Sequence, residues 1–564
     1  MIRSAAPPAE ATVVSVLVTM LERLGVERAF GVSGGAMAAL WDALSSSPLF
    51  VHHFRHESGA AFAAIEAGFA SGRPTVLFTT TGPGLTNALT GILAARGEGA
   101  RVIVISASTA VPARGRFAIQ ETSRDTMPSS FYESGRLFHF ASMVEDPAQL
   151  AGIERKLTAG LARRTAFVAH LAIDAAVQRA PASPVPIESV SATAEAPRGI
   201  DACVDALRDG PFALWVGFGA RDASAEVREL ARRMHAPVMC SPRGKGTFPE
   251  DDPLFVGVTG LAGHASVFQA LGAFRPRRLL VLGTRMGEPT SFWDPRYVTP
   301  RGFVHVDADP DVPGIAYPGS PTISVVGDVG ATLRAVLTEL APAGNGAMPA
   351  LPRPDIVRIE RRAEGLVRPE ALMDALQDQV LDRSDALVLA ESGNSFLWAT
   401  HRLRFAQPHR YRVSTGVGAM GQAAAGVVGA AVATGTKSVA IVGDGSLLMT
   451  NEINSAVQFA APAVWVVLND ARYGMCAQGM EALGLSADAS IPQVDFAAFA
   501  RAQGAGATRV EHEMQLDAAL EEAMTARGPF LVDVRIDPAC KAPASLRNKA
   551  LAGANDPKTF PLGS

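Results

Sequence analysis

Apolar residues recur along this chain with two different spacings. In residues 12–24, 36–43 and 58–70 they lie three or four positions apart, which predicts amphipathic helices. Short unbroken apolar runs lie between and after these helices and predict buried strands at 28–32, 50–54, 75–79 and 102–106. Buried strands that alternate with helices indicate a parallel sheet covered by helices on both faces.

Two stretches rich in proline, alanine and glycine, residues 178–199 and 341–354, interrupt this pattern. They show no periodicity, so we interpret them as linkers. Further strands are predicted between and after them, at 212–216, 278–282, 386–389, 439–442, 464–468 and 530–536. The predicted fold class is α/β, with three domains that are each an open parallel sheet with helices on both faces. These domains are expected at residues 1–182, 198–342 and 360–545, followed by a tail at 546–564.

The composition excludes several classes of protein. A net charge of −4 over 564 residues predicts no nucleic-acid or anionic-membrane partner. The four cysteines are scattered, so we expect neither a disulfide framework nor a zinc site. No apolar run is long enough to span a bilayer, and the N-terminus lacks the pattern of a signal peptide, which predicts a cytoplasmic protein.

Two acidic residues follow neighbouring strands of the third predicted domain. Asp444 stands between two glycines directly after one strand, and Asp470 follows the next strand 26 residues later. This spacing suits one strand–helix–strand unit, which places both carboxylates at one edge of the sheet. Such oxygen ligands suit Mg2+ or Ca2+, Gly445 allows close backbone approach, and a helix expected to start at Ser446 favours an anion. The pattern therefore predicts a site for a diphosphate and its metal.

These residues resemble the diphosphate-binding motif of the thiamine-diphosphate (ThDP) enzymes, which is Gly-Asp-Gly followed at this distance by an asparagine pair. Here the pair reads Asn469-Asp470, so the site carries an added negative charge. Gly-Asp-Gly alone fits a Rossmann-type turn equally well, and the second half of the motif favours the ThDP enzymes. The resemblance is nearest to the acetolactate-synthase-like branch and covers nearly the whole chain. It implies ThDP and Mg2+ as cofactors, with the metal bound by Asp444, Asp470 and Arg472.

In the first domain, Arg55-His56-Glu57 resembles the family element in which the glutamate bonds N1′ of the aminopyrimidine. The resemblance makes Glu57 catalytic, whereas an isolated glutamate here would only favour the helix dipole. Gln120 stands in a segment similar to the family's Phe-Gln-Glu-Thr and is implied to be catalytic and to contact substrate. The implied cofactor contacts are Glu57, Gly82, Asn87, Gly393, Asn394, Ser395, Gly418, Met420, Asp444, Gly445, Ser446 and Asp470, and the further substrate contacts are Ser33, Gly34, Gly35 and Cys476.

The resemblance implies an enzyme that decarboxylates a 2-oxo acid, with pyruvate favoured, and ligates the product to an acceptor carbonyl or thioester. The family's lysine after the Gln120 segment is not evident, since Leu-Phe-His-Phe occupies residues 137–140, and the residues around Cys476 depart from the branched-chain biosynthetic pattern. These departures favour a specialised carboligase over a housekeeping acetolactate synthase. A decarboxylase that does not ligate is the other alternative.

Two rivals from other classes fit less well. A NAD-dependent oxidoreductase would need the full Gly-x-Gly-x-x-Gly spacing, and a non-catalytic paralogue would have no need of intact Glu57 and Asp444. The family's active site forms between two chains, which implies a homodimer or homotetramer. FAD in the central domain is undecided, because Gly217-Phe218-Gly219 suits both a nucleotide loop and a plain turn.

Overall fold

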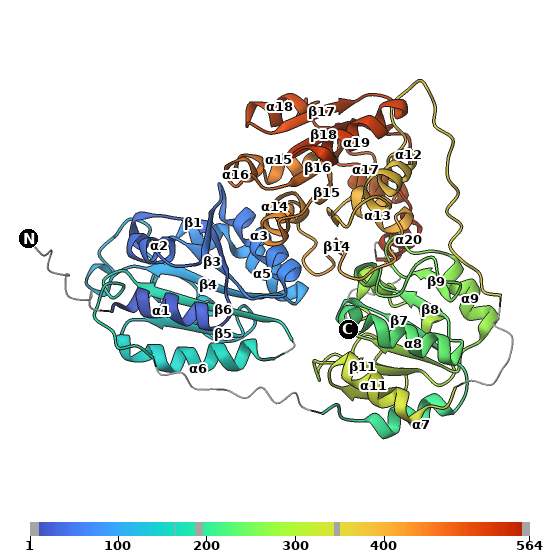
Figure 1. Ribbon diagram of the computed structural model, residues 1–564, viewed down its shortest axis with the longest axis horizontal. Helices are drawn as coiled ribbons and strands as arrows, with labels where there is room; N and C mark the ends of the chain where they lie inside the picture. The colour runs from blue at the N-terminus through green and yellow to red at the C-terminus, as the bar shows by residue number, and fades with distance from the viewer. Residues whose placement is uncertain (1–10, 164, 186–195, 343–349, 555–564) are drawn as a thin grey trace, which may run out of the picture. The chain divides into compact units, whose positions relative to one another are not determined.

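The computed structural model describes residues 11–163, 165–185, 196–342 and 350–554. It contains three six-stranded parallel sheets flanked by helices, which confirms the predicted α/β class (Figure 1). The chain forms two compact units. Unit 1 comprises residues 1–193, 416–436 and 450–462, and unit 2 comprises residues 194–415, 437–449 and 463–564. Within the described ranges, no helix is long and apolar enough to cross a membrane.

The first sheet lies in unit 1 and has the strand order β2-β1-β3-β4-β6-β5. Its strands are β1 (Arg28–Val32), β2 (Phe50–His53), β3 (Thr75–Thr79), β4 (Arg101–Ser108), β5 (Phe140–Val144) and β6 (Phe167–Asp174). Its helices are α1 (Val13–Arg23), α2 (Ala38–Ser45), α3 (Glu57–Ser71), α4 (Pro83–Asn87), α5 (Leu89–Glu98) and α6 (Leu150–Leu161). The apolar sides of α1, α2 and α6 form one core with this sheet, while α3 packs against α5, β1 and β3 (Figure 1).

Helix α3 is packed closely against α14 (Gln422–Thr434), a helix built almost entirely of alanine, glycine and valine. Small side chains let the two backbones approach each other. A Cβ at Gly429 would lie 2.0 Å from the Ala63 carbonyl oxygen, so this position tolerates only glycine. The alanine- and glycine-rich stretch of the sequence is therefore a buried helix of unit 1.

The second and third sheets lie in unit 2 and have the orders β12-β11-β10-β7-β8-β9 and β14-β13-β15-β16-β18-β17. The second sheet contains β7 (Phe212–Val216), β8 (Val238–Cys240), β9 (Phe255–Val258), β10 (Arg278–Leu282), β11 (Phe303–Asp307) and β12 (Thr322–Val326), with α7 (Ile200–Arg208), α8 (Ser224–Met234), α9 (Ser266–Phe274) and α11 (Val329–Glu339). The third contains β13 (Leu387–Ala390), β14 (Tyr411–Val413), β15 (Ser438–Gly443), β16 (Ala463–Asn469), β17 (Gly506–Val510) and β18 (Phe530–Arg535). Its helices in unit 2 are α12 (Pro369–Leu376), α13 (Asn394–Arg402), α15 (Asp444–Met449), α17 (Gly474–Ala482), α18 (Phe496–Ala502), α19 (Leu516–Thr525) and α20 (Ser545–Ala554).

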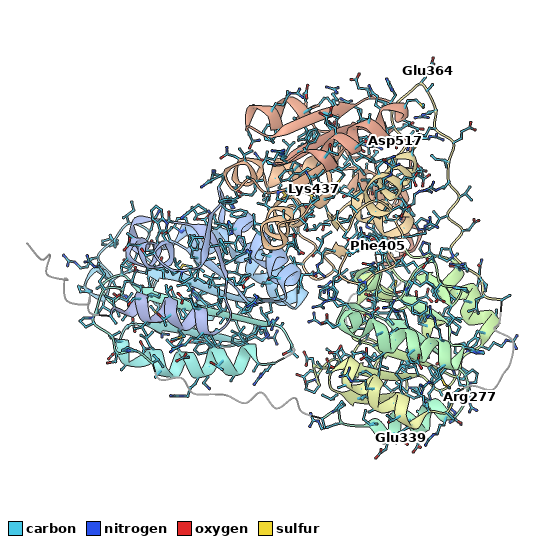
Figure 2. All side chains as sticks on the ribbon, viewed as in Figure 1. Arg277, Glu339, Glu364, Phe405, Lys437 and Asp517 are labelled. Carbon is cyan, nitrogen blue, oxygen red and sulfur yellow. The ribbon has the colours of Figure 1, made fainter. Side chains whose placement is uncertain are left out.

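Within unit 2, a buried ion pair lies beside Phe405, which Figure 2 labels. Lys245 Nζ lies 2.7 Å from Glu250 Oε2 and 5.7 Å from the centre of the Phe405 ring. The Glu250 amide also donates to the Phe405 carbonyl at 3.2 Å. Because the buried charges are paired with each other, they fix this contact between a loop of the second sheet and the segment before β14.

The first predicted linker is wrong at its beginning. Gln178 is 2% exposed, and its side-chain amide donates to the Ala36 carbonyl at 2.8 Å and accepts from the Leu40 amide at 3.3 Å. The Ala182 amide donates to the Ala11 carbonyl at 2.8 Å. Composition alone suggested a loose segment, but its first residues pack on unit 1. Part of each predicted linker, residues 186–195 and 343–349, lies outside the described residues, as does the tail from 555.

Candidate active site

When the strands of each sheet are numbered from its own first strand, the first and third sheets have the same strand order. In both, the second strand lies on one side of the first strand and the third strand lies on the other side, so the strand order changes direction between the first and third strands. In open parallel sheets, ligands bind beyond the carboxyl ends of the strands at this switch point. Here the neighbours at the switch point are β1 with β3 and β13 with β15. Many of the predicted site residues follow these four strands: Ser33, Gly34 and Gly35 follow β1, Gly82 and Asn87 follow β3, Gly393, Asn394 and Ser395 follow β13, and Asp444, Gly445 and Ser446 follow β15.

Glu57 is the centre of the first half-site, which we define as Glu57, Gly82, Asn87 and Gln120. It is the first residue of α3 and is 7% exposed. Asn87 Nδ2 donates to Glu57 Oε2 at 3.1 Å, and a Cβ at Gly84 would lie 3.2 Å from Glu57 Oε1. The segment after β3 therefore closes over the carboxylate. A buried carboxyl group held in this way is suited to share a proton with a ring nitrogen of a ligand.

Gln120 lies beside the same segment. Thr81 Oγ1 donates to Gln120 Oε1 at 3.3 Å, and the Gly82 amide donates to Thr122 Oγ1 at 2.5 Å. Gly82 has φ = +52°, which favours glycine, and a Cβ there would lie only 3.3 Å from the Gln120 Cβ. Gln120 itself has φ = +54°, a conformation that costs energy for a residue with a side chain.

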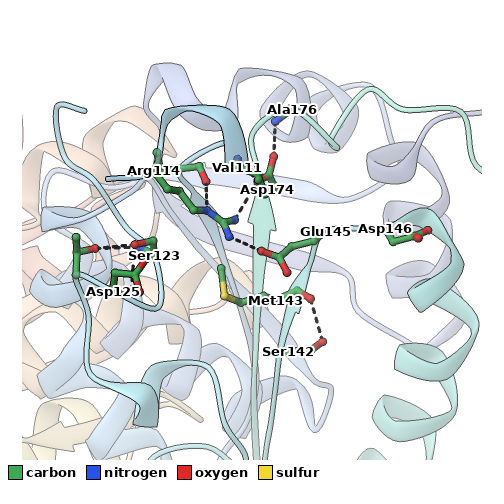
Figure 3. A network of polar contacts seen from close by, with 12 residues as sticks. Val111, Arg114, Ser123, Asp125, Ser142, Met143, Glu145, Asp146, Asp174 and Ala176 are labelled. Atoms are coloured by element: carbon green, nitrogen blue, oxygen red, sulfur yellow. Dashed lines mark hydrogen bonds and ion pairs between the residues drawn. The ribbon is translucent and has the colours of Figure 1, made fainter. Parts of the chain in front are cut away.

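An ion-pair network fastens the base of the loop that carries Gln120 (Figure 3). Arg114 donates to Asp174 Oδ2 at 3.0 Å and to Glu145 Oε1 at 2.5 Å. The carboxylate of Asp174 also accepts hydrogen bonds from the amides of Val111, at 2.9 Å, and Ala176, at 2.8 Å. Asp174 ends β6 and is 1% exposed, so its buried charge depends on these donors.

The glycine loop after β1 lies beside the residue that follows β3. A Cβ at Gly34 would lie 2.3 Å from Thr80 Oγ1, so this loop and the segment of the first half-site are in direct contact. Gly418 and Met420 lie elsewhere in unit 1, in the segment before α14. That segment is fastened by the Gly416 amide, which donates to the buried Glu98 Oε1 at 2.7 Å.

Asp444 and Asp470 form the acidic part of the second half-site, which we define as Asn394, Asp444 and Asp470. Asp444 is 3% exposed and accepts hydrogen bonds from the amides of Gly445 and Ala471, each at 2.7 Å. Burial, and next the charge of Asp470, raise the pKa of Asp444 to about 6. Burial also raises the pKa of Asp470. Two neighbouring buried carboxylates whose charges oppose each other are an arrangement that a divalent cation stabilises.

Arg472 can bind a metal only through its main chain. Its guanidinium Nε donates to Asp470 Oδ2 at 3.1 Å. Burial raises the pKa of Asp470, and this hydrogen bond is the largest of the influences that lower it. A guanidinium has no lone pair for a cation, so the side chain of Arg472 cannot be the ligand that the motif implied. Its carbonyl oxygen accepts from the Gly474 amide at 2.9 Å. This oxygen is the atom of Arg472 that is suited to bind a divalent cation.

Asn394 adds a neutral polar group to the second half-site. A Cβ at Gly474 would lie 2.9 Å from Asn394 Nδ2 and 3.1 Å from Asp470 Oδ2, so these side chains meet above the glycine. The buried Asn394 Oδ1 has no hydrogen-bond partner within the described residues. Gly393, with φ = +116°, precedes α13 and turns the chain into the helix. This cradle of amide, carboxylates and a glycine without a side chain fits a diphosphate with its metal.

One expectation for the second half-site is wrong in detail. The helix begins at Asp444 rather than Ser446. Gly445 also has a role in packing, since a Cβ there would lie 2.7 Å from the Tyr473 ring, and its place beside a ligand stays a prediction. Cys476 is exposed on α17, which begins four residues after Asp470.

The glycines of the central domain also have a structural explanation. A Cβ at Gly217 would lie 2.4 Å from Thr284 Cβ, and one at Gly219 would lie 2.9 Å from Gly283 Cα. The loops after β7 and β10 therefore pack directly against each other, and the glycines are needed for this contact whether or not a nucleotide binds. They carry no argument for FAD.

Sequence reasoning missed Thr122, Asp174 and the buried Glu452, which are polar residues that support the site. Thr122 lies two residues after Gln120 in a segment that was recognised, so its place near the site could have been predicted. Asp174 ends a strand, β6, that the pattern did not predict, and Glu452 bonds residues almost 400 positions away. No local signal in the sequence marks such partners.

Three family models match the chain in order. The N-terminal TPP binding domain of thiamine pyrophosphate enzymes matches residues 11–128, the central domain matches 210–336, and the C-terminal TPP binding domain matches 391–534. Together they cover well over half of the chain. The chain therefore belongs to the thiamine-pyrophosphate enzymes, and it is a ThDP-dependent enzyme of the acetolactate-synthase-like group.

Two relatives and one solved structure are similar to this chain. The acetolactate synthase large subunit of Parasynechococcus marenigrum is 29% identical, with 93% of this chain and 87% of that protein covered. A probable 2-ketoarginine decarboxylase of Pseudomonas aeruginosa is 27% identical, with 94% and 95% covered. The crystal structure of benzoylformate decarboxylase from Polynucleobacter necessarius has the same fold, with a TM-score of 0.82, 19% identity and 94% and 99% coverage.

Proposed function

We propose that this chain uses ThDP and Mg2+ to remove CO2 from a 2-oxo acid, with pyruvate as the favoured donor, and to ligate the remaining acyl group to an acceptor carbonyl or thioester. When bound, ThDP supplies the carbon nucleophile and the electron sink that this chemistry needs. The observation that carries the proposal is Glu57, a buried carboxylate bonded at 3.1 Å to Asn87, which follows a switch-point strand of the first sheet.

In this proposal the two half-sites have different tasks. Glu57 holds the proton that it shares with the aminopyrimidine ring, and Gln120 donates from its amide to the substrate, because Thr81 Oγ1 engages the Oε1 of that amide. Asp444 and Asp470 hold the Mg2+ with a carbonyl oxygen of the loop after β16, and Asn394 contacts the diphosphate.

The segment at residues 137–140 supports a specialised carboligase rather than a housekeeping acetolactate synthase. Phe138 is fully buried, and its ring stacks on His170 with centroids 4.9 Å apart. The His139 amide bonds the Val168 carbonyl at 2.8 Å. The segment therefore packs into the sheet and presents no cation to a second 2-oxo acid.

A homo-oligomer is part of the same proposal. Phe117 and Ile119 lie three residues and one residue before Gln120, and they are 101% and 92% exposed. Exposed apolar side chains next to a polar functional residue are typical of surfaces that another protein covers. A second copy of the chain is the partner that the resemblance to the acetolactate-synthase-like enzymes implies.

The test is mass spectrometry of the products formed from 13C-labelled pyruvate with ThDP and Mg2+, with and without aldehydes, 2-oxo acids and acyl thioesters. Label in a ligated product supports the carboligase and names the acceptor class. Label only in CO2 and acetaldehyde supports the non-ligating decarboxylase, and label that stays in pyruvate rejects pyruvate as the donor.

A further inference from the structure

Glu452 is a buried carboxylate of unit 1 whose partners lie next to Glu57. It stands directly before helix α16 (Ile453–Gln458) and is 1% exposed. Its Oε2 accepts the backbone amide of Arg55 at 3.1 Å, and its Oε1 accepts the backbone amide of His56, also at 3.1 Å. Ser455 Oγ donates to Oε2 at 2.5 Å. One carboxylate thus bonds two successive amides immediately before the first residue of α3.

We propose that Glu452 is a positioning residue for Glu57, an inference that rests on the proposed function of Glu57. The Arg55 and His56 amides are the last two donors before α3, so the carboxylate fixes the backbone at the point where the chain turns from β2 into the helix. Glu57 is the next residue, and the direction of its side chain follows from that turn. Glu452 therefore holds the catalytic carboxylate through the main chain without contacting the ligand.

Gly59 shows that the first turn of α3 packs closely against Glu452. A Cβ at Gly59 would lie 2.4 Å from Glu452 Oε1, so the first turn of α3 approaches the carboxylate as closely as a glycine permits. The side chain of Arg55 binds the same region, with Nε donating to Asn454 Oδ1 and Nη2 to Gln458 Oε1, each at 2.8 Å. Glu452 acts on the backbone, whereas Asn454 and Gln458 act on a side chain.

The chemistry of the contact requires a carboxylate. Each of the two amide N–H groups bonds a different oxygen of Glu452, and charge-assisted bonds of this kind are stronger than neutral ones. Glu452→Gln keeps the volume but turns one acceptor into a donor that faces an N–H group. Glu452→Asp keeps both acceptors on a side chain that is one methylene shorter. The two variants therefore separate the loss of the bonds from a change in side-chain reach.

The test compares full-length wild type, Glu452→Gln, Glu452→Asp and the control Asn454→Ala. In the protein without cofactor, backbone amide exchange of the segment 54–58 is measured by mass spectrometry. In the protein with ThDP and Mg2+, the dissociation constant of ThDP and the rate of deuterium exchange at C2 of its thiazolium are measured by calorimetry and by NMR after acid quenching. Asn454→Ala removes a bond to the Arg55 side chain and leaves the two amide bonds in place.

For Glu452→Gln we expect faster amide exchange in this segment and a C2 exchange rate lowered roughly tenfold or more, because small displacements of a catalytic group are costly. The ThDP dissociation constant should change less than the rate, Glu452→Asp should recover part of the rate, and Asn454→Ala should behave as wild type. Wild-type C2 exchange in Glu452→Gln, or an equal loss in Asn454→Ala, overturns the inference. If wild type itself does not accelerate C2 exchange, the proposed function fails instead, and the inference with it.

Discussion

Asn87 Nδ2 donates to Glu57 Oε2 across 3.1 Å and joins the segments that follow β3 and β2, the two strands that flank β1 in one sheet. The bond orients the carboxylate of Glu57 from the side of α4, while the backbone before Glu57 is held from the side of α16. The carboxylate is therefore constrained both at its oxygen atoms and at its own main chain.

Glu57→Gln is expected to abolish most of the activity, because an amide cannot share an acidic proton with a ring nitrogen. We expect turnover of the donor to fall by roughly 100-fold or more. Asn87→Ala leaves the carboxylate but removes its donor, so we expect a smaller loss of roughly tenfold. Steady-state turnover checks both changes. Calorimetry should show that Glu57→Gln still binds ThDP, and a variant with wild-type turnover would contradict the assigned role.

Binding of Mg2+ is expected to weaken in acid. The pKa of Asp444 is raised to about 6 by burial and by Asp470, so below this pH the carboxyl group holds a proton that a metal must displace. We predict a Mg2+ affinity that falls by about tenfold per pH unit below pH 6. Calorimetry with Mg2+ and ThDP between pH 5 and 8 checks this, and Asp444→Asn should remove the dependence along with most of the affinity.

The stability of the metal-free protein should change with pH in the opposite sense to that of a salt-bridged acid. The pKa of Asp444 is higher in the folded protein than its usual 3.8, so between pH 4 and about 6 the folded state binds more protons than the unfolded state. The contribution of this group therefore makes the fold less stable as the pH rises through that window. Thermal unfolding with and without Mg2+ should show a larger stabilisation by Mg2+ at pH 7 than at pH 5.

Asp174→Asn is expected to damage both stability and activity. The buried carboxylate bonds Arg114 and two backbone amides, and its loss leaves the guanidinium without a charged partner on that side. A cost of about 3 kcal/mol in the free energy of unfolding is expected. Gln120→Ala is the matched variant, because it should lower kcat/KM without a comparable loss in chemical denaturation. Equal stability of Asp174→Asn and wild type would contradict this account of the loop.

Gly429→Ala should force α3 and α14 apart. A Cβ there would lie 2.0 Å from the Ala63 carbonyl oxygen, which is backbone and cannot move alone. We expect a loss of about 3 kcal/mol or more in the free energy of unfolding. Gly152→Ala in α6 is the control, since the nearest atom to its Cβ is 3.9 Å away and alanine favours the helix by up to about 1 kcal/mol. Chemical denaturation compares the two variants.

The strands that sequence analysis located with correct bounds are those with continuous apolar runs. β1, β3, β7 and β10 begin and end where the pattern predicts, because a strand buried on both faces leaves no polar position to interrupt it. β14 was missed because it has three residues, one of which is Arg412. Local periodicity carries too little information for such a strand, whose place is fixed by pairing with β13.

The candidate site was predictable where its residues stand in motifs, and unpredictable where they act from a distance. Glu57, Asp444 and Asp470 each follow a strand in a recognisable order: Asp444 follows a strand at a switch point, and Glu57 and Asp470 follow strands next to one. Glu452 belongs to the same stretch of sequence as Asp444, yet its carboxylate serves residues 396 and 397 positions earlier. Only the three-dimensional pairing of α16 with the start of α3 reveals that role.

The contact between α3 and α14 has a consequence for how the chain is made. Helix α3 ends at residue 71 and its covering helix begins at residue 422, so a ribosome must add about 350 further residues before the buried face of α3 has its partner. At ordinary translation rates this takes roughly 20–70 s. During that time the nascent first unit exposes a surface of alanine and phenylalanine side chains, and chaperone capture at this surface should decide how much of the newly synthesised protein reaches the native state.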